Sequence, residues 1–319
     1  MGGKMEHIYL GMKVVLPLLL FMSIGILVRK LKWVSEKAFT DLNRIVFRVF
    51  MPISLFLNAS AVDMKEVFSE ENVKVLSYAL IALVIVYLAS ELICARLFKD
   101  KKRQVVVIQA VYRSNLVLFG LPICNAIYGE GGAGVVSIFI ITIVPLYNIV
   151  GALLLARGME QKQSFGSVLL KVIMNPLVIG AVLGILYNLT GGIIPKIIMS
   201  PLKQLGNIAT PLAFIVLGGS LVLNRMKEEG KIIAAICGVR LCLIPALVLA
   251  GAVILGTKGV TLVALVAIFA TPTSVSSYTM AKEAGVDSDL AGDVVAVSTV
   301  LSLVTVCFFI SLAGYMNLL

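Results

Sequence analysis

The stretch QAVYRSNLVLFGLPICNAIYG, residues 109–129, is apolar enough to enter a bilayer, yet its centre is polar and interrupted. Arg113, Ser114 and Asn115 are followed by Gly120 and Pro122. Proline lacks a backbone N–H and clashes with the carbonyl four residues earlier, so a helix through Pro122 is expected to kink or break. In lipid, freed backbone groups are tolerated only where they face protein or a watery cavity. The stretch therefore predicts a broken membrane helix with a binding site at the break.

A second interrupted stretch, IFATPTSVSSYTMAKEAG, lies in the other half of the chain at residues 268–285. Its proline is surrounded by hydroxyl side chains, which are Thr271, Thr273, Ser274, Ser276 and Ser277 around Pro272. Two interrupted apolar segments, one in each half, are typical of secondary transporters that bind substrate near the bilayer midplane.

The composition excludes an ordinary soluble domain. Hydrophobic residues make up 60% of the 319 residues and charged residues 14%, whereas about a quarter of the residues of a soluble domain are charged. We therefore expect a multi-pass protein of the cell membrane. The net charge of +10 arises mostly from short loops between apolar spans, which is the positive-inside pattern and predicts no nucleic-acid partner. The five cysteines lie in apolar spans without a C-x-x-C pair, so no metal site is predicted.

A helix needs about 20 apolar residues to cross the hydrocarbon core. Ten segments meet this expectation, at residues 8–28, 39–60, 73–97, 105–128, 133–156, 168–189, 208–223, 231–255, 260–282 and 291–315. Residues 195–207, before the short seventh segment, are expected to form an interfacial segment or a loop. Lys and Arg concentrate in the loops after odd-numbered spans, which places both termini outside the cytoplasm.

The two halves of the chain repeat at a constant difference in residue number, the difference between Pro17 and Pro176. We call this difference the repeat offset. Three coincidences share this offset: Pro17 with Pro176, residues 25–27 (GIL) with 184–186 (GIL), and Pro52 with Pro211. Residues 1–156 therefore form a first five-span repeat and residues 157–319 a second one. Because five is odd, the second repeat must be inverted in the membrane. Pro122 and Pro272 do not share the offset, so either loops or helix breaks are expected to differ between the halves.

Three motifs carry a family resemblance. They are Asn115, Gly120, Pro122 and Tyr128-Gly129 in the fourth span, Pro272 with Tyr278 and residues 281–283 (AKE) in the ninth, and residues 43–47 (NRIVF) with Pro52 in the second. In these residues the chain resembles the auxin efflux carrier family, which includes plant PIN-type carriers and bacterial malate or malonate permeases. The resemblance covers essentially the whole chain.

The resemblance implies an all-α fold of ten transmembrane helices arranged as a 5+5 inverted repeat. Spans 1, 2, 6 and 7 would form a scaffold, and spans 3–5 and 8–10 would form a transport domain. Spans 4 and 9 would break at their prolines and cross. A small organic anion would bind beside the crossing and move by elevator-type alternating access. Family members of this kind are often homodimers.

At such a crossing, two half-helix N-termini would offer partial positive charge and unpaired N–H groups to a carboxylate. The expected substrate contacts are Asn115, Pro122, Thr271, Pro272, Thr273 and Ser274 at the breaks and Thr142 and Asn148 in the fifth span. Structural roles remain open for these residues. The Asn115 amide could satisfy freed backbone groups, the Thr271 and Ser274 hydroxyls could bond within their own helix, and Thr142 and Asn148 could serve packing alone.

Four charged residues lie within the predicted spans: Arg113, Arg240, Glu91 and Asp293. Intramembrane charge is expensive and by default indicates a functional site. Structural ion pairs within the transport domain are the favoured interpretation, and a proton carrier at Glu91 or Asp293 is the alternative.

The competing function is a sodium- or proton-coupled symporter or cation exchanger of the same architecture. The hydroxyl-rich residues 271–277 favour it, and the lack of acidic residues at either break weakens it. The coupling ion, Na⁺ or H⁺, therefore stays open, and no other cofactor is expected. An enzyme is not expected, because no nucleophile–base set is visible.

Overall fold

The computed structural model of the chain is all-helical and describes residues 2–61, 69–158, 166, 170, 174–191, 194–220 and 226–319. The start of the predicted sixth span, and most of the segment that joins the two predicted halves, lie outside the described residues.

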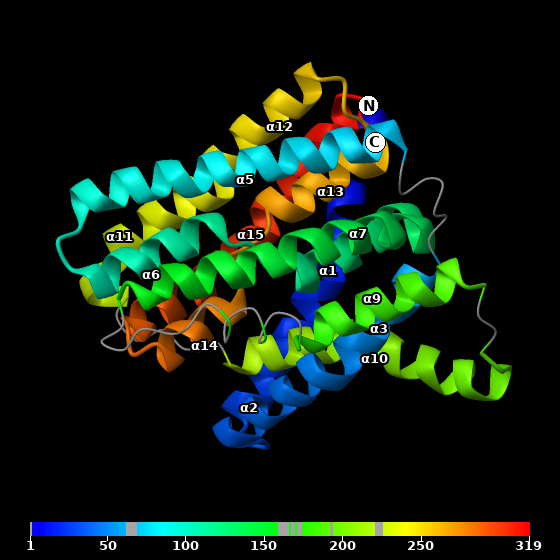
Figure 1. The fold of residues 1–319 in the computed structure, drawn as a ribbon, viewed down its shortest axis with the longest axis horizontal. Helices are drawn as coiled ribbons and strands as arrows, with labels where there is room; N and C mark the ends of the chain where they lie inside the picture. Colours follow the sequence, from blue (N-terminus) through cyan, green and yellow to red (C-terminus); the bar gives the residue numbers. More distant parts are fainter. Residues whose placement is uncertain are drawn as a thin grey trace.

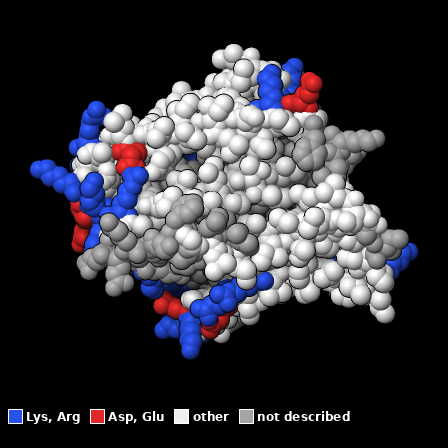
Figure 2. All heavy atoms as spheres, viewed as in Figure 1, with Lys and Arg blue, Asp and Glu red and all other residues white. Residues whose placement is uncertain are grey.

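Within the described residues, five helical stretches are long and apolar enough to cross a membrane: Glu36–Ser60, Glu70–Leu97, Val135–Ala156, Glu228–Ile254 and Ser288–Tyr315. Shorter apolar helices cover Leu116–Gly129, Pro176–Leu189 and Gly259–Phe269. Figure 2 shows that Lys, Arg, Asp and Glu gather at the edges of the molecule and leave a broad expanse of uncharged side chains between them. The chain is therefore a polytopic membrane protein, as the composition predicts.

One group of helices comes from the beginnings of the two predicted halves (Figure 1). It contains α1 (Gly2–Lys30), α2 (Glu36–Ile45), η1 (Val46–Phe50), α3 (Met51–Ser60), α9 (Pro176–Leu189) and α10 (Lys196–Ser220). The run α2–η1–α3 is continuous and begins where the Ser35 hydroxyl caps it by accepting a hydrogen bond from the Ala38 N–H at 3.2 Å. α1 packs along α10, and α3 packs against both α9 and α10.

Residues 196–207 are helical in the structure, so of the two expected alternatives, an interfacial segment or a loop, the loop is wrong. They form the first half of α10 together with Pro195 just before it. The Pro195 carbonyl accepts hydrogen bonds from Ile198 and Met199. A proline at a helix start loses no hydrogen bond, because the first N–H groups of a helix have no partner within it.

The second group contains the remaining helices. It comprises α5 (Glu70–Leu97), α6 (Lys101–Tyr112), η2 (Leu116–Gly120), α7 (Leu121–Ala156), α11 (Met226–Gly238), η3 (Val239–Leu243), α12 (Ile244–Ile254), α13 (Gly259–Phe269), α14 (Val275–Glu283) and α15 (Ser288–Tyr315). α7 is interrupted at Gly129, whose φ of 68° is in the left-handed region that glycine tolerates. This single residue makes the predicted turn between the fourth and fifth spans.

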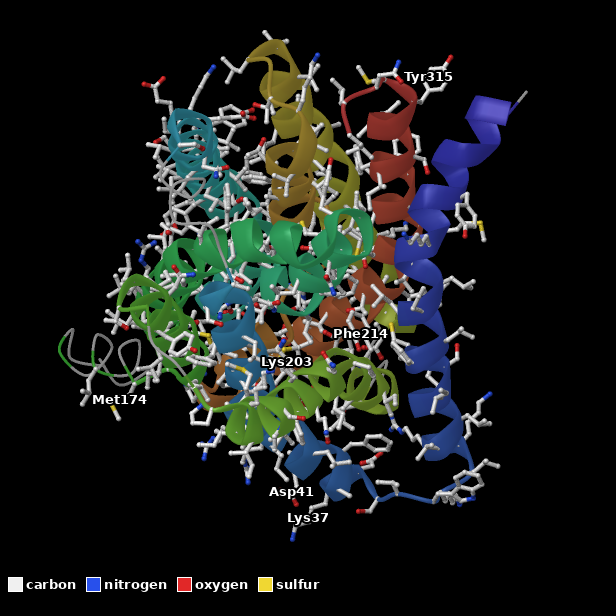
Figure 3. The ribbon with its side chains drawn as sticks, turned by 90° about the vertical axis from the view of Figure 1, so that its right-hand side faces the viewer. Lys37, Asp41, Met174, Lys203, Phe214 and Tyr315 are labelled. Carbon is white, nitrogen blue, oxygen red and sulfur yellow. The ribbon has the colours of Figure 1, made fainter. Side chains whose placement is uncertain are left out.

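The two groups meet along α1, which lies against α15 as well as α10. Figure 3 shows α1 and α15 side by side, with Tyr315 at one end of the molecule and Lys37 and Asp41 at the other. A ring contact between Phe119 of η2 and Phe214 of α10, with centroids 5.0 Å apart, joins the groups in the interior.

Close helix packing within the first group follows the repeat offset. A Cβ atom added to Gly25 of α1 would overlap the Ile215 carbonyl of α10, and one added to Gly184 of α9 would overlap the Phe56 carbonyl of α3. The offset that pairs Gly25 with Gly184 also pairs Phe56 with Ile215. Small residues let membrane helices approach this closely. The sequence repeat therefore coincides with two equivalent helix contacts.

Candidate functional site

The first helix break lies at residues 113–115. α6 ends at Tyr112, Arg113 is extended (φ −92°, ψ 114°), and η2 begins at Leu116 after Asn115 (φ −91°, ψ 53°). Pro122 lies further on, at the start of α7 and inside the helical run 116–129. The expectation that this span breaks at Pro122 is therefore wrong. Pro122 comes just after the π-helical turn η2, where the regular α-helical hydrogen bonding is already interrupted. The N–H that Pro122 lacks therefore falls where the regular pattern is already broken.

The second break surrounds Pro272, as its sequence predicts. α13 ends at Phe269 and α14 begins at Val275. Pro272 has no N–H to donate, and the preceding residue is biased away from helical backbone angles. Ser274, the residue before α14, is extended (φ −63°, ψ 134°).

The two breaks pair with each other through their backbones. Ser114 and Thr273 form an isolated antiparallel bridge. Two hydrogen bonds flank it, from the Asn115 N–H to the Pro272 carbonyl (2.8 Å) and from the Ser274 N–H to the Arg113 carbonyl (3.3 Å). In this way each break satisfies backbone groups that the other has freed from its helix.

This pairing also follows the repeat offset. The offset pairs Asn115 with Ser274 and Arg113 with Pro272. Of the two expected differences between the halves, in loops or in helix breaks, the difference in helix breaks is therefore wrong. Arg113, not Pro122, is the counterpart of Pro272, so a comparison of prolines could not find the equivalence.

A cavity of about 500 Å³ opens beside the paired breaks. Its wall includes both breaks, the second half of α7, the α2–η1 run and the start of α9. The polar and charged residues of this wall, with Met280, are Thr40, Asn43, Arg44, Arg48, Arg113, Ser114, Asn115, Tyr147, Asn148, Asn175, Ser274, Ser276 and Thr279. Half-helices begin at Leu116 and Val275, next to this cavity. Their first N–H groups have no partners within the helix and carry partial positive charge.

Arg113 is a buried cation held by neutral groups. Its guanidinium donates to the Tyr147 carbonyl (3.1 Å), Asn148 Oδ1 (2.6 Å) and Ser276 Oγ (2.9 Å), and Nη1 lies 3.1 Å from Met280 Sδ. None of these partners is a carboxylate, and its Nε has no hydrogen-bond partner in the described chain. The positive charge of Arg113 is therefore held in place without being neutralised by these contacts.

Asn115 is the clearest candidate for a substrate contact. Its side chain lines the cavity and is only 4% exposed, yet Nδ2 has no hydrogen-bond partner among the described residues. A buried donor without a partner costs about 1–3 kcal/mol. By contrast, Ser114 Oγ is paired with Tyr147 Oη (3.0 Å) and Ser274 Oγ with Ser276 Oγ (2.8 Å).

The other predicted contacts are placed differently. Thr271, just after the end of α13, donates to the Ala267 carbonyl (2.7 Å) of that helix, and Thr142 donates to the Ile138 carbonyl (3.1 Å) within α7. Thr273 donates to the Ala110 carbonyl (2.8 Å) and so ties the second break to α6.

The two predicted prolines also lie apart from this cavity, since neither contributes to its wall. Pro272 contributes its backbone carbonyl to the paired breaks. Pro122 lines a separate cavity of about 580 Å³, together with residues of α1, α3, α9 and α10.

The described hydrogen-bond partners of Arg113 and Arg240 are neutral groups, and Glu91 forms its ion pair with a different arginine. Glu91 binds Arg157 (2.7 Å) rather than Arg113. Arg240 is fully buried and donates to the carbonyls of Val111, Ile268 and Thr271. Asp293 is fully buried in α15.

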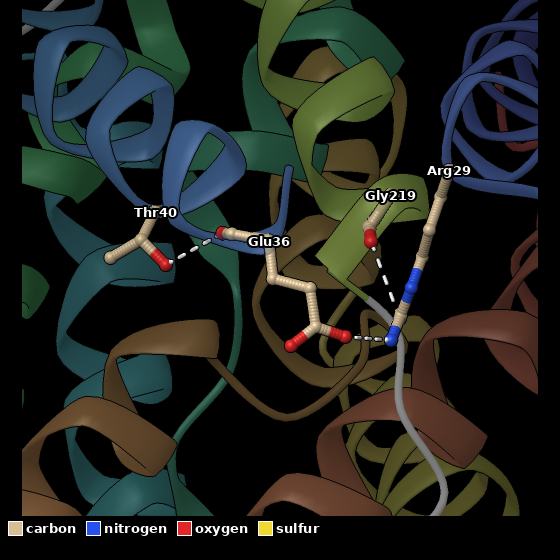
Figure 4. Close-up of polar contacts among 4 residues, drawn as sticks. All are labelled: Arg29, Glu36, Thr40 and Gly219. Atoms are coloured by element: carbon tan, nitrogen blue, oxygen red, sulfur yellow. Dashed lines mark hydrogen bonds and ion pairs between the residues drawn. The ribbon is translucent and has the colours of Figure 1, made fainter. Parts of the chain in front are cut away.

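A third cavity, of about 330 Å³, shares Thr40, Asn43 and Thr279 with the 500 Å³ cavity. Arg29 lines it and joins three helices: Nη2 pairs with Glu36 Oε1 (2.7 Å) of α2, and Nη1 donates to the Gly219 carbonyl (3.4 Å) of α10 (Figure 4). Lys282 of α14 lies in the wall as well. Both cavities lie between the first and second helix groups.

Sequence reasoning missed the contribution of the second span to this site. Arg44 and Arg48 line the 500 Å³ cavity from α2 and η1. The signal was available, since two arginines four residues apart fall on one helix face inside an apolar span.

Comparison with known proteins shows the family of the chain. The Mem_trans family, described as "Membrane transport protein", matches residues 10–310. An "Uncharacterized transporter" of Methanothermobacter thermautotrophicus is 25% identical over 296 residues, which cover 91% of this chain and 94% of the relative. This family consists of transporters, not enzymes. The chain belongs to the Mem_trans membrane transport protein family, which is the auxin efflux carrier family.

Proposed function

We propose that the protein is a secondary transporter that carries a small organic anion across the cell membrane. The observation that carries this proposal is the Asn115 amide, buried without a hydrogen-bond partner among the described residues in the wall of a cavity where two half-helices begin. A carboxylate placed there would accept from Asn115 Nδ2 and from the N–H groups of Leu116 and Val275, which have no partner within their own helices. Each half-helix start contributes about half a unit of positive charge.

The charge around the cavity supports an anion over a cation. Arg113, Arg44 and Arg48 all line the wall. The described lining residues include no Asp or Glu. Arg44 is paired with Asp41 at 3.5 Å, in an exposed contact that water screens. A cation would meet repulsion at this site, whereas an anion would be drawn toward the paired breaks.

The architecture we propose is a 5+5 inverted repeat of ten spans with crossing, broken fourth and ninth spans. The support is that three features share the repeat offset: the Gly25 and Gly184 contacts, the paired breaks and the half-helix starts. In this proposal α1–α3, α9 and α10 form the scaffold, and α5–α7 and α11–α15 form the transport domain.

Movement between these two groups would give elevator-type alternating access. The 500 Å³ and 330 Å³ cavities lie between the groups on the side of Arg29 and Lys282, and the 580 Å³ cavity lies between them on the side of Lys13 and Lys203. The positive-inside rule assigns the first side to the cytoplasm and both termini to the outside. The anion would then move together with the paired breaks from one side of the membrane to the other.

The test is flux in proteoliposomes loaded with labelled malonate, malate or an aromatic monocarboxylate. We expect saturable flux of at least one of them, and an affinity roughly tenfold weaker in Asn115→Ala, the weight of one hydrogen bond to a charged group. Thr142→Ala is the matched control, because its hydroxyl is bonded within its own helix; its flux should equal that of the wild type. No saturable flux of any of these anions, or an unchanged Asn115→Ala, would refute the proposal.

A further inference from the structure

Arg240 does not line the anion cavity and lies where the two half-helices that precede the breaks, α6 and α13, end. It is fully buried within η3, a π-helical turn. Its Nη1 donates to the Val111 carbonyl (3.3 Å), and its Nη2 donates to the carbonyls of Ile268 (2.9 Å) and Thr271 (3.1 Å). The guanidinium therefore joins the last turn of α6 to the last turn of α13 and to the second break.

The charges at this point are complementary. A helix C-terminus carries about half a unit of negative charge, so two converging C-termini present about one unit. One guanidinium carries one positive charge and has donors to spare for three carbonyls. Among the described contacts, its hydrogen-bond acceptors are all backbone carbonyls, so its partner is the pair of helix ends.

Converging helix C-termini of this kind bind a metal cation in other transporters. Unwound backbone carbonyls and half-helix C-terminal ends coordinate Na⁺ in transporters with discontinuous helices. Here the same kinds of group accept hydrogen bonds from the guanidinium of Arg240, a cation that is part of the chain itself. The repeat is broken at this position, since the residue that the repeat offset pairs with Arg240 is Ile81, which is exposed on α5. A single side chain near the pairing of the two breaks serves both halves.

We propose that Arg240 is the built-in counter-cation of the crossing and a positioning residue for it, so that anion binding requires no bound Na⁺. This deepens the proposed function by choosing between its coupling modes, and it rests on that function only for the statement about anion binding. The N-terminal side of the crossing then stays positive and open, while the C-terminal side is neutralised permanently.

The decisive measurement is thermal unfolding of the purified full chain in detergent, followed with a thiol-reactive dye that reports exposure of the buried Cys94, Cys124 and Cys237. No organic anion is present, so a failure of the proposed function does not affect the result. For the wild type we expect the same melting temperature in sodium, potassium and choline chloride. A higher melting temperature in sodium alone would overturn the proposal.

Chemical rescue tests the role of the charge. Arg240→Ala should lower the melting temperature by several degrees, and low concentrations of guanidinium chloride should restore at least half of the loss. Urea is the neutral counterpart of guanidinium and should restore nothing. Arg157→Ala, which removes an exposed partner of Glu91, should respond to neither compound. Equal effects of guanidinium and urea on Arg240→Ala would count against the proposal.

If Arg240→Ala does not fold, two other measurements test the proposal: the unfolding of other Arg240 variants and the sodium dependence of wild-type flux. Arg240→Lys retains the charge with fewer donors and should unfold at a temperature between those of wild type and Arg240→Met. In proteoliposomes, wild-type anion flux should be unchanged when sodium is replaced by choline on both sides. A flux that vanishes without sodium would reject the built-in cation while leaving anion transport in place.

Discussion

The repeat offset pairs Asn115 with Ser274, and each is the last residue before a half-helix that starts beside the cavity. Their side chains differ in one respect that bears on binding. Asn115 Nδ2 has no hydrogen-bond partner among the described residues, whereas Ser274 Oγ is paired with Ser276 Oγ. The first break therefore has an unused donor for an anion, and the second break has a hydroxyl that is already engaged in a hydrogen bond.

This asymmetry predicts unequal effects of substitution. Asn115→Ser, which places the residue of the second break at the first, should weaken anion affinity by roughly tenfold, the weight of one hydrogen bond to a charged group. Ser274→Ala should change it by less than threefold, since Ser276 loses only a neighbouring hydroxyl. Concentration dependence of flux measures both. Equal losses in the two variants would show that the breaks contribute alike.

The charge of Arg113 gives a second prediction, because Asn148 Oδ1 accepts from its Nη2 at 2.6 Å. Asn148→Asp keeps the shape but supplies a carboxylate that would form an ion pair with the guanidinium. Anion affinity should fall at least tenfold while the melting temperature stays the same or rises. Asn148→Leu is the counterpart: it removes the acceptor and keeps the charge free, so it should unfold earlier and bind the anion within a few-fold of wild type. Normal transport by Asn148→Asp would mean that Arg113 is purely structural.

The equivalent glycine contacts give a third prediction. Gly25→Ala and Gly184→Ala each place a methyl group against a carbonyl of the neighbouring helix. Overpacking of this kind typically costs about 1–3 kcal/mol, and the two variants should lose similar stability because their contacts are equivalent. Gly230→Ala is the control, since a Cβ there meets nothing within 4 Å, and alanine favours a helix interior by roughly 1 kcal/mol over glycine. Thermal unfolding in detergent measures all three, and a stable Gly184→Ala would contradict the close approach.

Hydropathy and repeats predicted much of this fold. Apolar length predicted a polytopic membrane protein, and matches such as Gly25 with Gly184 identified contacts that the structure shows to be equivalent. The break near Pro272 was predicted correctly because a proline in a helix interior removes a backbone hydrogen bond and disrupts the helix. Pro122 misled the same argument, since a proline near a helix start is tolerated and the actual break is stabilised by pairing with a distant segment.

The site was harder to predict for a related reason. Polarity placed Asn115, Asn148 and Ser274 at the cavity, but the hydroxyl of Thr271 instead bonds to a carbonyl of the preceding helix, and no sequence signal distinguishes the two cases. Arg48 reaches the cavity from a helix of the other group, and only the packing of the two groups brings it there. Local patterns report periodicity and breaks, whereas partners far apart in the chain depend on tertiary contacts.

The pairing of Glu91 with Arg157 gives a last prediction, about coupling. Glu91 Oε1 lies 2.7 Å from Arg157 Nη1, with 30% and 54% of the two side chains exposed. An exposed pair of this kind contributes less than about 1 kcal/mol, and its carboxylate is not among the described hydrogen-bond partners of Arg113. Glu91→Gln should therefore leave both the rate of anion flux and its dependence on external pH unchanged. Flux compared at several external pH values measures this, with Asp293→Asn as the companion variant because Asp293 is fully buried. A pH dependence that disappears in Glu91→Gln but persists in Asp293→Asn would identify Glu91 as a proton carrier and overturn its purely structural role.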